Sequence, residues 1–174
     1  MSFLLAVLLI AFAALSRFLP HPANFAAIAA MALFGGVYLD KRYAFIVPMV
    51  AMLVSDYFLG FHSTVPFVYG SFLLTGLIGL WLKGHKKLGW VVGASVTSSV
   101  LFFVITNFGV WLMGMHPFGT GGYSQNFAGL IECYVVAIPF FRNTIVGDLL
   151  YVGVLFGIYE SALHFLRVKR TREV

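Results

Sequence analysis

Long apolar blocks, separated by short polar breaks, run along nearly the whole chain. Six blocks reach or approach the roughly 20 apolar residues that a helix needs to cross about 30 Å of hydrocarbon. Proline, glycine or charged residues lie between the blocks and are residue types that end helices. The pattern therefore predicts a bundle of six transmembrane helices, at 2–17, 23–39, 43–61, 65–82, 88–114 and 143–166.

Composition supports this interpretation. Of the 174 residues, 61% are hydrophobic and 10% are charged, whereas about 25% of a soluble domain is charged. We expect an all-α integral membrane protein with a single domain over 1–174, in which the net charge of +5 concerns topology and lipid rather than nucleic acid. The first fifteen residues have no Lys or Arg before their apolar stretch, so we expect a retained span and no signal peptide.

The basic residues predict the orientation of the helices, because short loops rich in Lys and Arg stay in the cytoplasm. With six spans and a cytoplasmic N-terminus, the inner side receives Lys41, Arg42, Lys83, Lys86, Lys87, Arg167, Lys169, Arg170 and Arg172. Only Arg17 and Arg142 then lie at the outer face. We expect both termini in the cytoplasm and a location in the cell inner (cytoplasmic) membrane.

The segment 126–141 is apolar but does not fit a seventh span. Its 16 residues would rise about 24 Å as a helix, which is short of the hydrocarbon thickness, and they include Glu132 and Pro139. A seventh span would also place the basic C-terminal tail outside. We therefore expect an extra interfacial or re-entrant helix on the outer side.

This threading gathers polar residues of several kinds at the outer side. Carboxylates, guanidinium groups, amides and imidazoles together are typical of a pocket for a polar solute. The predicted solute-binding residues are Arg17, His21, Asn24, Asp56, His62, Asn107, Glu132, Arg142, Asn143 and Asp148. Because Asp56 and Asp148 fall within helices, we expect one of them to pair with Arg17 or Arg142.

Other chemistry has weaker support in the sequence. His21, His62 and His116 lack the close spacing of a metal site, and no nucleophile has an evident partner, so we expect no metal, no cofactor and no enzyme activity. Small residues at four-residue spacing let helices approach closely in lipid. Such pairs are Ala26 and Ala30, Gly89 and Gly93, Ser95 and Ser99, and Gly153 and Gly157.

Three strings resemble a small uncharacterised prokaryotic family of multi-pass membrane proteins: "SRFLPHPANFAAIAAMALFGG", "SDYFLGFH" and "CYVVAIPFFRNTIVGDLLY". In helix number, orientation and length, the predicted architecture also resembles the substrate-binding S components of energy-coupling factor (ECF) vitamin transporters. That resemblance implies capture of a vitamin-like molecule outside the cell. It also implies docking on a transmembrane coupling subunit with two ATPases, through a small-residue motif that matches Ala26 and Ala30.

Two other classes of function remain open. A structural or scaffold membrane protein would also be small, basic at its inner ends and free of catalytic motifs. An intramembrane enzyme would use Asp56, Asp148, Glu132 or a histidine as acid and base. A polar cavity on the outer side would favour solute binding, and a tightly packed bundle without a cavity would favour a structural role.

Overall fold

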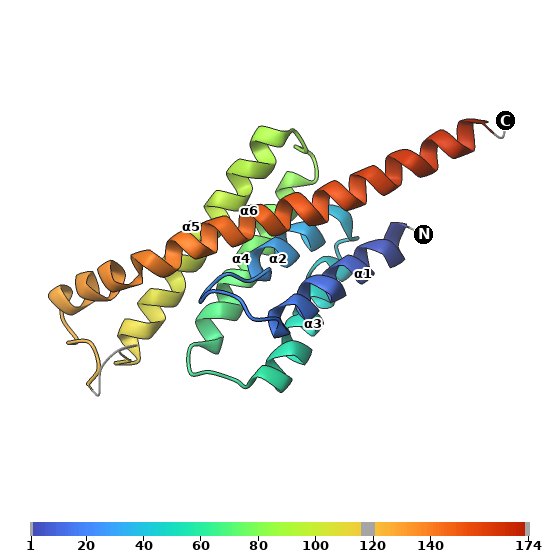
Figure 1. Cartoon of the computed structure of the whole chain (residues 1–174). Helices are drawn as coiled ribbons and strands as arrows, with labels where there is room; N and C mark the ends of the chain where they lie inside the picture. The colour runs from blue at the N-terminus through green and yellow to red at the C-terminus, as the bar shows by residue number, and fades with distance from the viewer. Residues whose placement is uncertain (1, 116–120, 173–174) are drawn as a thin grey trace.

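The computed structural model describes residues 2–115 and 121–172, with side chains up to residue 169. This part of the chain is helical and contains no strand, which confirms the all-α class. Six α-helices and one 3-10 turn follow one another (Figure 1). They are α1 (Ser2–Leu15), η1 (Ser16–Phe18), α2 (Ile28–Tyr38), α3 (Tyr43–Leu59), α4 (Val65–Leu82), α5 (Leu88–Leu112) and α6 (Phe127–Arg172).

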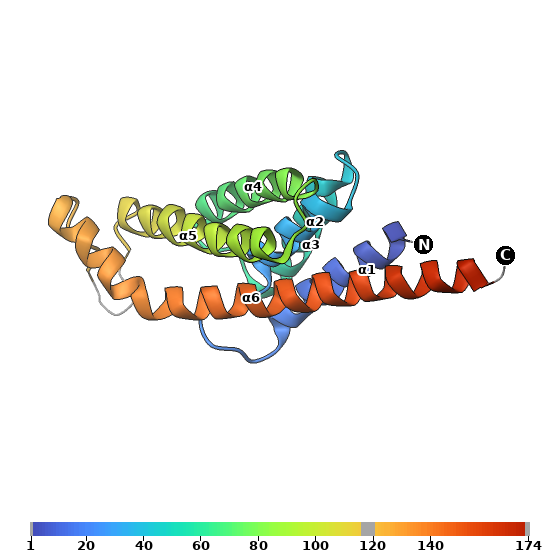
Figure 2. The same ribbon diagram turned by 90° about the horizontal axis from the view of Figure 1, so that it is seen from above.

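Helix α2 lies at the centre of the bundle and contacts each of the other five α-helices. All residues from Ala29 to Val37 are buried, and this stretch consists of apolar residues and glycine, as burial on every side requires. The two views in Figures 1 and 2 show α2 enclosed by its neighbours. It is the core around which the longer helices pack.

The predicted span 23–39 is wrong in length. Helix α2 has 11 residues, which rise about 16 Å and cannot cross about 30 Å of hydrocarbon. Pro20 and Pro22 prevent a regular helix in the preceding segment, and the backbone of Asn24 has φ 61°, a left-handed conformation that an α-helix does not contain. The first intrahelical hydrogen bond runs from Met31 N–H to the Ala27 carbonyl.

The expectation of a separate helix at 126–141 is also wrong. One helix of 46 residues, α6, runs from Phe127 through Pro139 to Arg172. Figure 2 shows its first turns inclined to the remainder, as expected where a proline removes one backbone hydrogen bond. A helix of this length rises about 69 Å, more than twice the hydrocarbon thickness, so part of it extends beyond that layer if it crosses the membrane upright.

Within the described residues, three helices are long and apolar enough to cross a membrane: α4, α5 and α6. Helices α1, α2 and α3 are apolar but shorter. Length and composition thus identify fewer full spans than the six expected, because α1, α2 and α3 have 14, 11 and 17 residues.

Side-chain contacts define two opposite ends of the bundle. At one end, the Tyr159 hydroxyl donates to the Ser2 carbonyl, and the Tyr38 hydroxyl donates to Glu160. Lys86 lies 4.9 Å from the centre of the Tyr38 ring, which brings the α4–α5 connection to the same place. The start of α1 and the end of α6 lie at this end in Figures 1 and 2. The α1–α2 connection and the C-terminal end of α5 lie away from it.

Candidate functional site: a polar cavity beside Asp148

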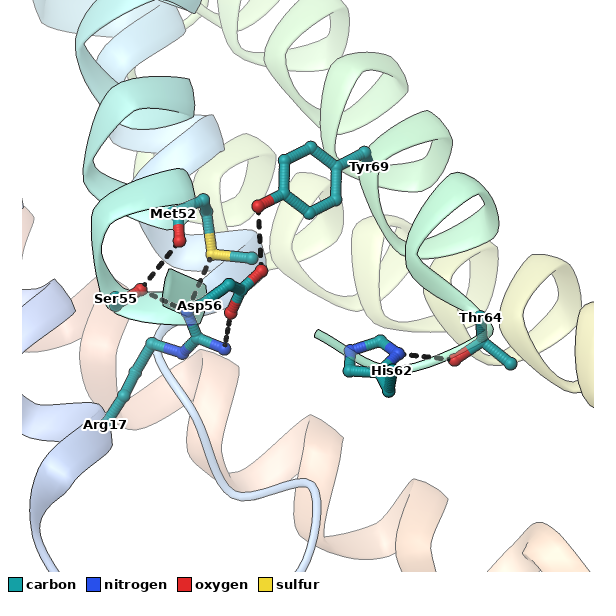
Figure 3. Close-up of polar contacts among 7 residues, drawn as sticks. All are labelled: Arg17, Met52, Ser55, Asp56, His62, Thr64 and Tyr69. Atoms are coloured by element: carbon teal, nitrogen blue, oxygen red, sulfur yellow. Dashed lines mark hydrogen bonds and ion pairs between the residues drawn. The ribbon is translucent and has the colours of Figure 1, made fainter. Parts of the chain in front are cut away.

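An ion pair between Arg17 and Asp56 joins η1 to α3. Arg17 Nη2 lies 2.6 Å from Asp56 Oδ1, and the two side chains are 10% and 2% exposed. Arg17 Nη1 also donates to Ser55. This contact confirms the expectation that Arg17 or Arg142 pairs with Asp56 or Asp148. Figure 3 shows the guanidinium reaching from the end of the first helix toward both α3 side chains.

Tyr69 completes this buried network from α4. Its hydroxyl donates to Asp56 Oδ2 at 2.8 Å, so both carboxylate oxygens have partners. The network ties three elements together, and burial strengthens each of its interactions because little water screens the charges. Asp56 is therefore a structural partner of Arg17, and its oxygens are already engaged.

A cavity of about 310 Å³ lies next to this network. Four of the predicted solute-binding residues line it: Arg17, His21, Asn24 and Asp148. Apolar and small residues complete the wall, namely Ala26, Ile28, Ala29, Leu59, Phe102 and Thr144. A concave site with a mainly apolar lining and a few convergent polar groups has the character of a small-molecule site.

Asp148 is the buried carboxylate of this cavity, at 2% exposure. The Ser99 hydroxyl donates to Oδ2 at 2.7 Å, and the backbone N–H of Ala30 donates to the same carboxylate. In the described part of the chain it forms no ion pair with an arginine or lysine. Asp148 therefore differs from Asp56, because two neutral donors hold it where a guanidinium holds Asp56.

The segment 19–25 between η1 and α2, which contains Pro20 and Pro22 and is called the corner below, is fixed against α6. The Asn143 side-chain amide donates to the Ala23 carbonyl at 3.0 Å, and Phe25 N–H donates to the Pro22 carbonyl at 3.0 Å. Asn24, with φ 61°, is the only described non-glycine residue with positive φ. Asparagine tolerates this conformation better than most residues, so the corner holds its polar side chains at the cavity wall.

A second cavity of about 440 Å³ adjoins the same corner and shares Asn24 with the first. Asn107, Tyr123 and Cys133 line it together with apolar residues of α5 and α6. Asn107 donates its side-chain N–H to the Phe103 carbonyl at 2.8 Å, and its own carbonyl lies 3.4 Å from Cys133 Sγ. Burial raises the pKa of the Tyr123 hydroxyl.

Five predicted site residues line neither cavity: Asp56, His62, Glu132, Arg142 and Asn143. Asp56 and Asn143 instead make the contacts described above. His62 is exposed and lies 2.8 Å from Thr64 Oγ1 through its Nδ1 atom, on the loop that Figure 3 shows apart from the Arg17 network. Glu132 and Arg142 are exposed on α6. Among the described residues, no three His, Cys, Asp or Glu side chains could together hold a metal ion. His116 lies outside the described residues.

The two alanines predicted to dock a partner have different surroundings. Ala26 precedes α2 and lines the 310 Å³ cavity, whereas Ala30 is completely buried within α2. The structure thus gives Ala30 a packing position inside the chain. A third groove, of about 650 Å³, lies between α1 and α3 and is lined by apolar residues apart from Ser55 and Tyr43. It lacks the chemistry of a polar-solute site.

Several residues of the site were not predicted from the sequence. Ser55 accepts a hydrogen bond from Arg17, Tyr69 and Ser99 donate to the two carboxylates, and Phe102 and Thr144 line the cavity. A weak signal existed for Thr144, which is next to Asn143 and one helical turn before Asp148. Nothing in the spacing of Tyr69 or Phe102 links either residue to a residue of another helix.

The fold and the cavity define an all-helical protein with apolar helices of membrane-crossing length and a polar cavity at one end of the bundle. The chain belongs to a family of unknown function, DUF6580, whose model matches residues 1–170. No curated protein and no solved structure matches the chain.

Proposed function

We propose that this chain is a multi-pass membrane protein that binds a small polar solute in the cavity beside Asp148. The observation that carries the proposal is the convergence of Arg17, His21, Asn24 and Asp148 on one concave surface of about 310 Å³. These residues come from η1, the α1–α2 connection and α6. A buried carboxylate next to a cavity costs free energy unless a partner compensates it, so a role in binding accounts for its presence.

The distribution of charge supports an outward-facing cavity. Lys83 donates to the Leu39 carbonyl, and Lys86 lies over Tyr38, so the α4–α5 loop and the end of α2 meet near the N-terminus. This is the end where the positive-inside rule would place the cytoplasm. The cavity lies near Arg17, after the far end of α1. We infer cytoplasmic termini in the inner (cytoplasmic) membrane, with the six helices forming one bundle.

The resemblance to ECF S components suggests a direction of transport for the bound solute. On that proposal the protein captures a vitamin-like molecule from the outer side and delivers it inward. A transmembrane coupling subunit with two ATPases would supply the energy. Ala26 then has two candidate roles, in the cavity wall and in docking on the coupling subunit. A substitution of Ala26 therefore has to be tested for its effect on solute binding and for its effect on docking.

A structural role is the second candidate, and the Arg17–Asp56–Tyr69 network favours it. That network links three helix segments and leaves no carboxylate oxygen of Asp56 without a partner. It explains Arg17 and Asp56 without any solute. It does not explain the cavity or the position of Asp148 in its wall.

Mass spectrometry of small molecules retained after gentle purification tests the proposal. Wild-type protein should retain one solute, and Ala26→Phe should lose it because the larger side chain occupies the cavity. Ala128→Phe, an equal change at an exposed position of α6, should retain it. A wild-type protein with no retained solute, or equal retention by Ala26→Phe, would contradict the proposal.

A further inference from the structure

Two residues of the cavity beside Asp148, Thr144 and His21, offer hydrogen-bond acceptors to a ligand. Thr144 Oγ1 donates its hydrogen to the Phe140 carbonyl at 3.1 Å, which leaves its lone pairs for another donor. His21 Nδ1 lies 2.9 Å from the Pro22 carbonyl and must donate to it. In the neutral ring, His21 Nε2 is then an acceptor. These two groups and Asp148 all line the cavity.

The charge of the cavity wall is also unbalanced toward the negative. Arg17 is neutralised by Asp56 at 2.6 Å. Asp148 has two neutral donors, the Ser99 hydroxyl and the Ala30 N–H, whereas a carboxylate offers about four lone-pair sites. A hydrogen-bonding cation in the cavity would supply both the missing charge and the missing donors.

The rest of the lining sets the shape of such a molecule. Phe102, Leu59 and Ile28 are apolar and face the same cavity, and an aromatic ring attracts a cation over its face in addition to offering apolar contact. The volume of about 310 Å³ lies at the lower end of the range for small-molecule sites. The site therefore suits a compact molecule with an apolar or aromatic body.

We propose that the solute is a small organic cation whose N–H donors bind Asp148 and whose apolar or aromatic body lies against Phe102. This inference rests on the proposed solute-binding function and specifies its substrate class. Asp148 acts as the counter-ion of the solute, and Thr144 and His21 accept its remaining donors. Arg17 holds the wall in place through Asp56.

Three probes of similar shape and different charge test the substrate class: benzamidine (cation), benzyl alcohol (neutral) and benzoate (anion). Binding to the purified full-length protein is measured by calorimetry, and displacement of the retained solute is measured by mass spectrometry. Benzamidine should bind and displace the solute, and the other two should not. No binding of benzamidine, or equal binding of benzoate or benzyl alcohol, would overturn the inference.

Variants then locate the cation. Asp148→Asn should weaken benzamidine binding about 10- to 100-fold, as expected for the loss of a charge-assisted hydrogen bond. Asp40→Asn makes the same change in charge at an exposed position between α2 and α3 and should leave binding unchanged. Thr144→Val preserves side-chain shape and should weaken binding to a smaller extent, which keeps the test available should Asp148→Asn fold poorly. Unchanged affinity in Asp148→Asn would contradict the inference.

Failure of this inference and failure of the proposed function give different results. The retained-solute experiment does not depend on charge. An anionic or neutral solute that Ala26→Phe fails to retain would exclude an organic cation and leave solute binding in this cavity standing. A protein that retains no solute would contradict the proposed function itself.

Discussion

Asp56 and Asp148 show how one residue type acquires two roles from its surroundings. Both are buried, at 1% and 2% exposure. Asp56 has a guanidinium and a phenol as partners, whereas Asp148 has a serine hydroxyl and a backbone amide beside a cavity. The sequence predicted that both residues are deep. It could not predict which one pairs with Arg17, because that depends on how η1 and α3 meet in space.

The two carboxylates should respond differently to neutralisation. Asp56→Asn leaves the buried Arg17 charge uncompensated and should lower the free energy of unfolding by about 3 to 5 kcal/mol. Asp148→Asn removes a buried charge without leaving an arginine unpaired, so the stability of the ligand-free protein should stay equal or rise. Denaturation in detergent measures both, with the exposed Asp40→Asn as control. Equal destabilisation by the two variants would contradict this assignment.

The effect of a substitution at Asn24 on stability should depend on the shape of the new side chain, because the backbone there has positive φ. Its φ of 61° is open to glycine and costly for a β-branched residue. Asn24→Gly should melt close to wild type, whereas Asn24→Val should lose about 1 to 2 kcal/mol. Both variants remove the amide, so both should bind solute more weakly. Equal melting temperatures for the two variants would show that the corner adopts another conformation in the membrane.

At the scale of elements, the close approach of α2 and α4 determines the core. A Cβ atom on Gly79 would lie 2.5 Å from the Leu33 carbonyl oxygen, and one on Gly36 would lie 2.7 Å from Gly79 Cα. Two of the four small-residue pairs predicted from four-residue spacing take no part in such close contacts. Gly89, Gly93, Gly153 and Gly157 have no neighbouring atoms where a Cβ would be placed. Spacing identifies small residues, but only the packing shows which of them a neighbouring backbone touches.

Alanine substitutions of these glycines should therefore fall into two groups by their effect on stability. Gly79→Ala places a methyl group against the α2 backbone and should cost about 1 to 3 kcal/mol or more, since backbone cannot move aside easily. Gly153→Ala meets open space and should be neutral or stabilising, because alanine favours a helix. Thermal melting in one detergent compares them. A Gly79→Ala variant as stable as Gly153→Ala would show that α2 and α4 are further apart.

Element boundaries were predictable where the sequence marks both ends. Helices α3, α4 and α5 begin at the residues expected from the loops "LDKR", "GFHSTVP" and "KGHKK". The predictions failed at α2 and α6. The left-handed turn at Asn24 delays the start of α2, and Pro139 bends α6 without ending it. A proline in a long apolar segment is compatible with either a break or a bend, and tertiary contacts decide between them.

At the scale of the whole molecule, the positions of the basic residues and the side-chain contacts agree with one arrangement of helix directions. Tyr38, Lys86, Glu160 and Ser2 meet at one end, as alternating helix directions require. Composition and charge predicted this arrangement because they average over many residues. The cavity was predicted only as a set of polar residues on one side, since its walls depend on packing between helices far apart in sequence.

Cysteine labelling tests the topology directly. In a Cys133→Ala background, which removes the one native cysteine, His62→Cys should react with a membrane-impermeant maleimide on intact cells. Lys41→Cys and His85→Cys should react only after permeabilisation, because the positive-inside rule places them in the cytoplasm. Reaction of the Lys41→Cys or His85→Cys variant on intact cells would contradict the predicted cytoplasmic location of these positions and therefore the six-span topology.

The central claim is that the cavity faces outward and binds a solute. Its most direct test is a labelling rate. Ala26→Cys, at the cavity wall, is made in the Cys133→Ala background, and its reaction with the same maleimide is followed on intact cells. We expect labelling from outside, slowed when the small molecules released from denatured wild-type protein are added. The corresponding extract from Ala26→Phe should leave the rate unchanged. Labelling only after permeabilisation, or the same rate with both extracts, would contradict an outward-facing cavity that binds a solute.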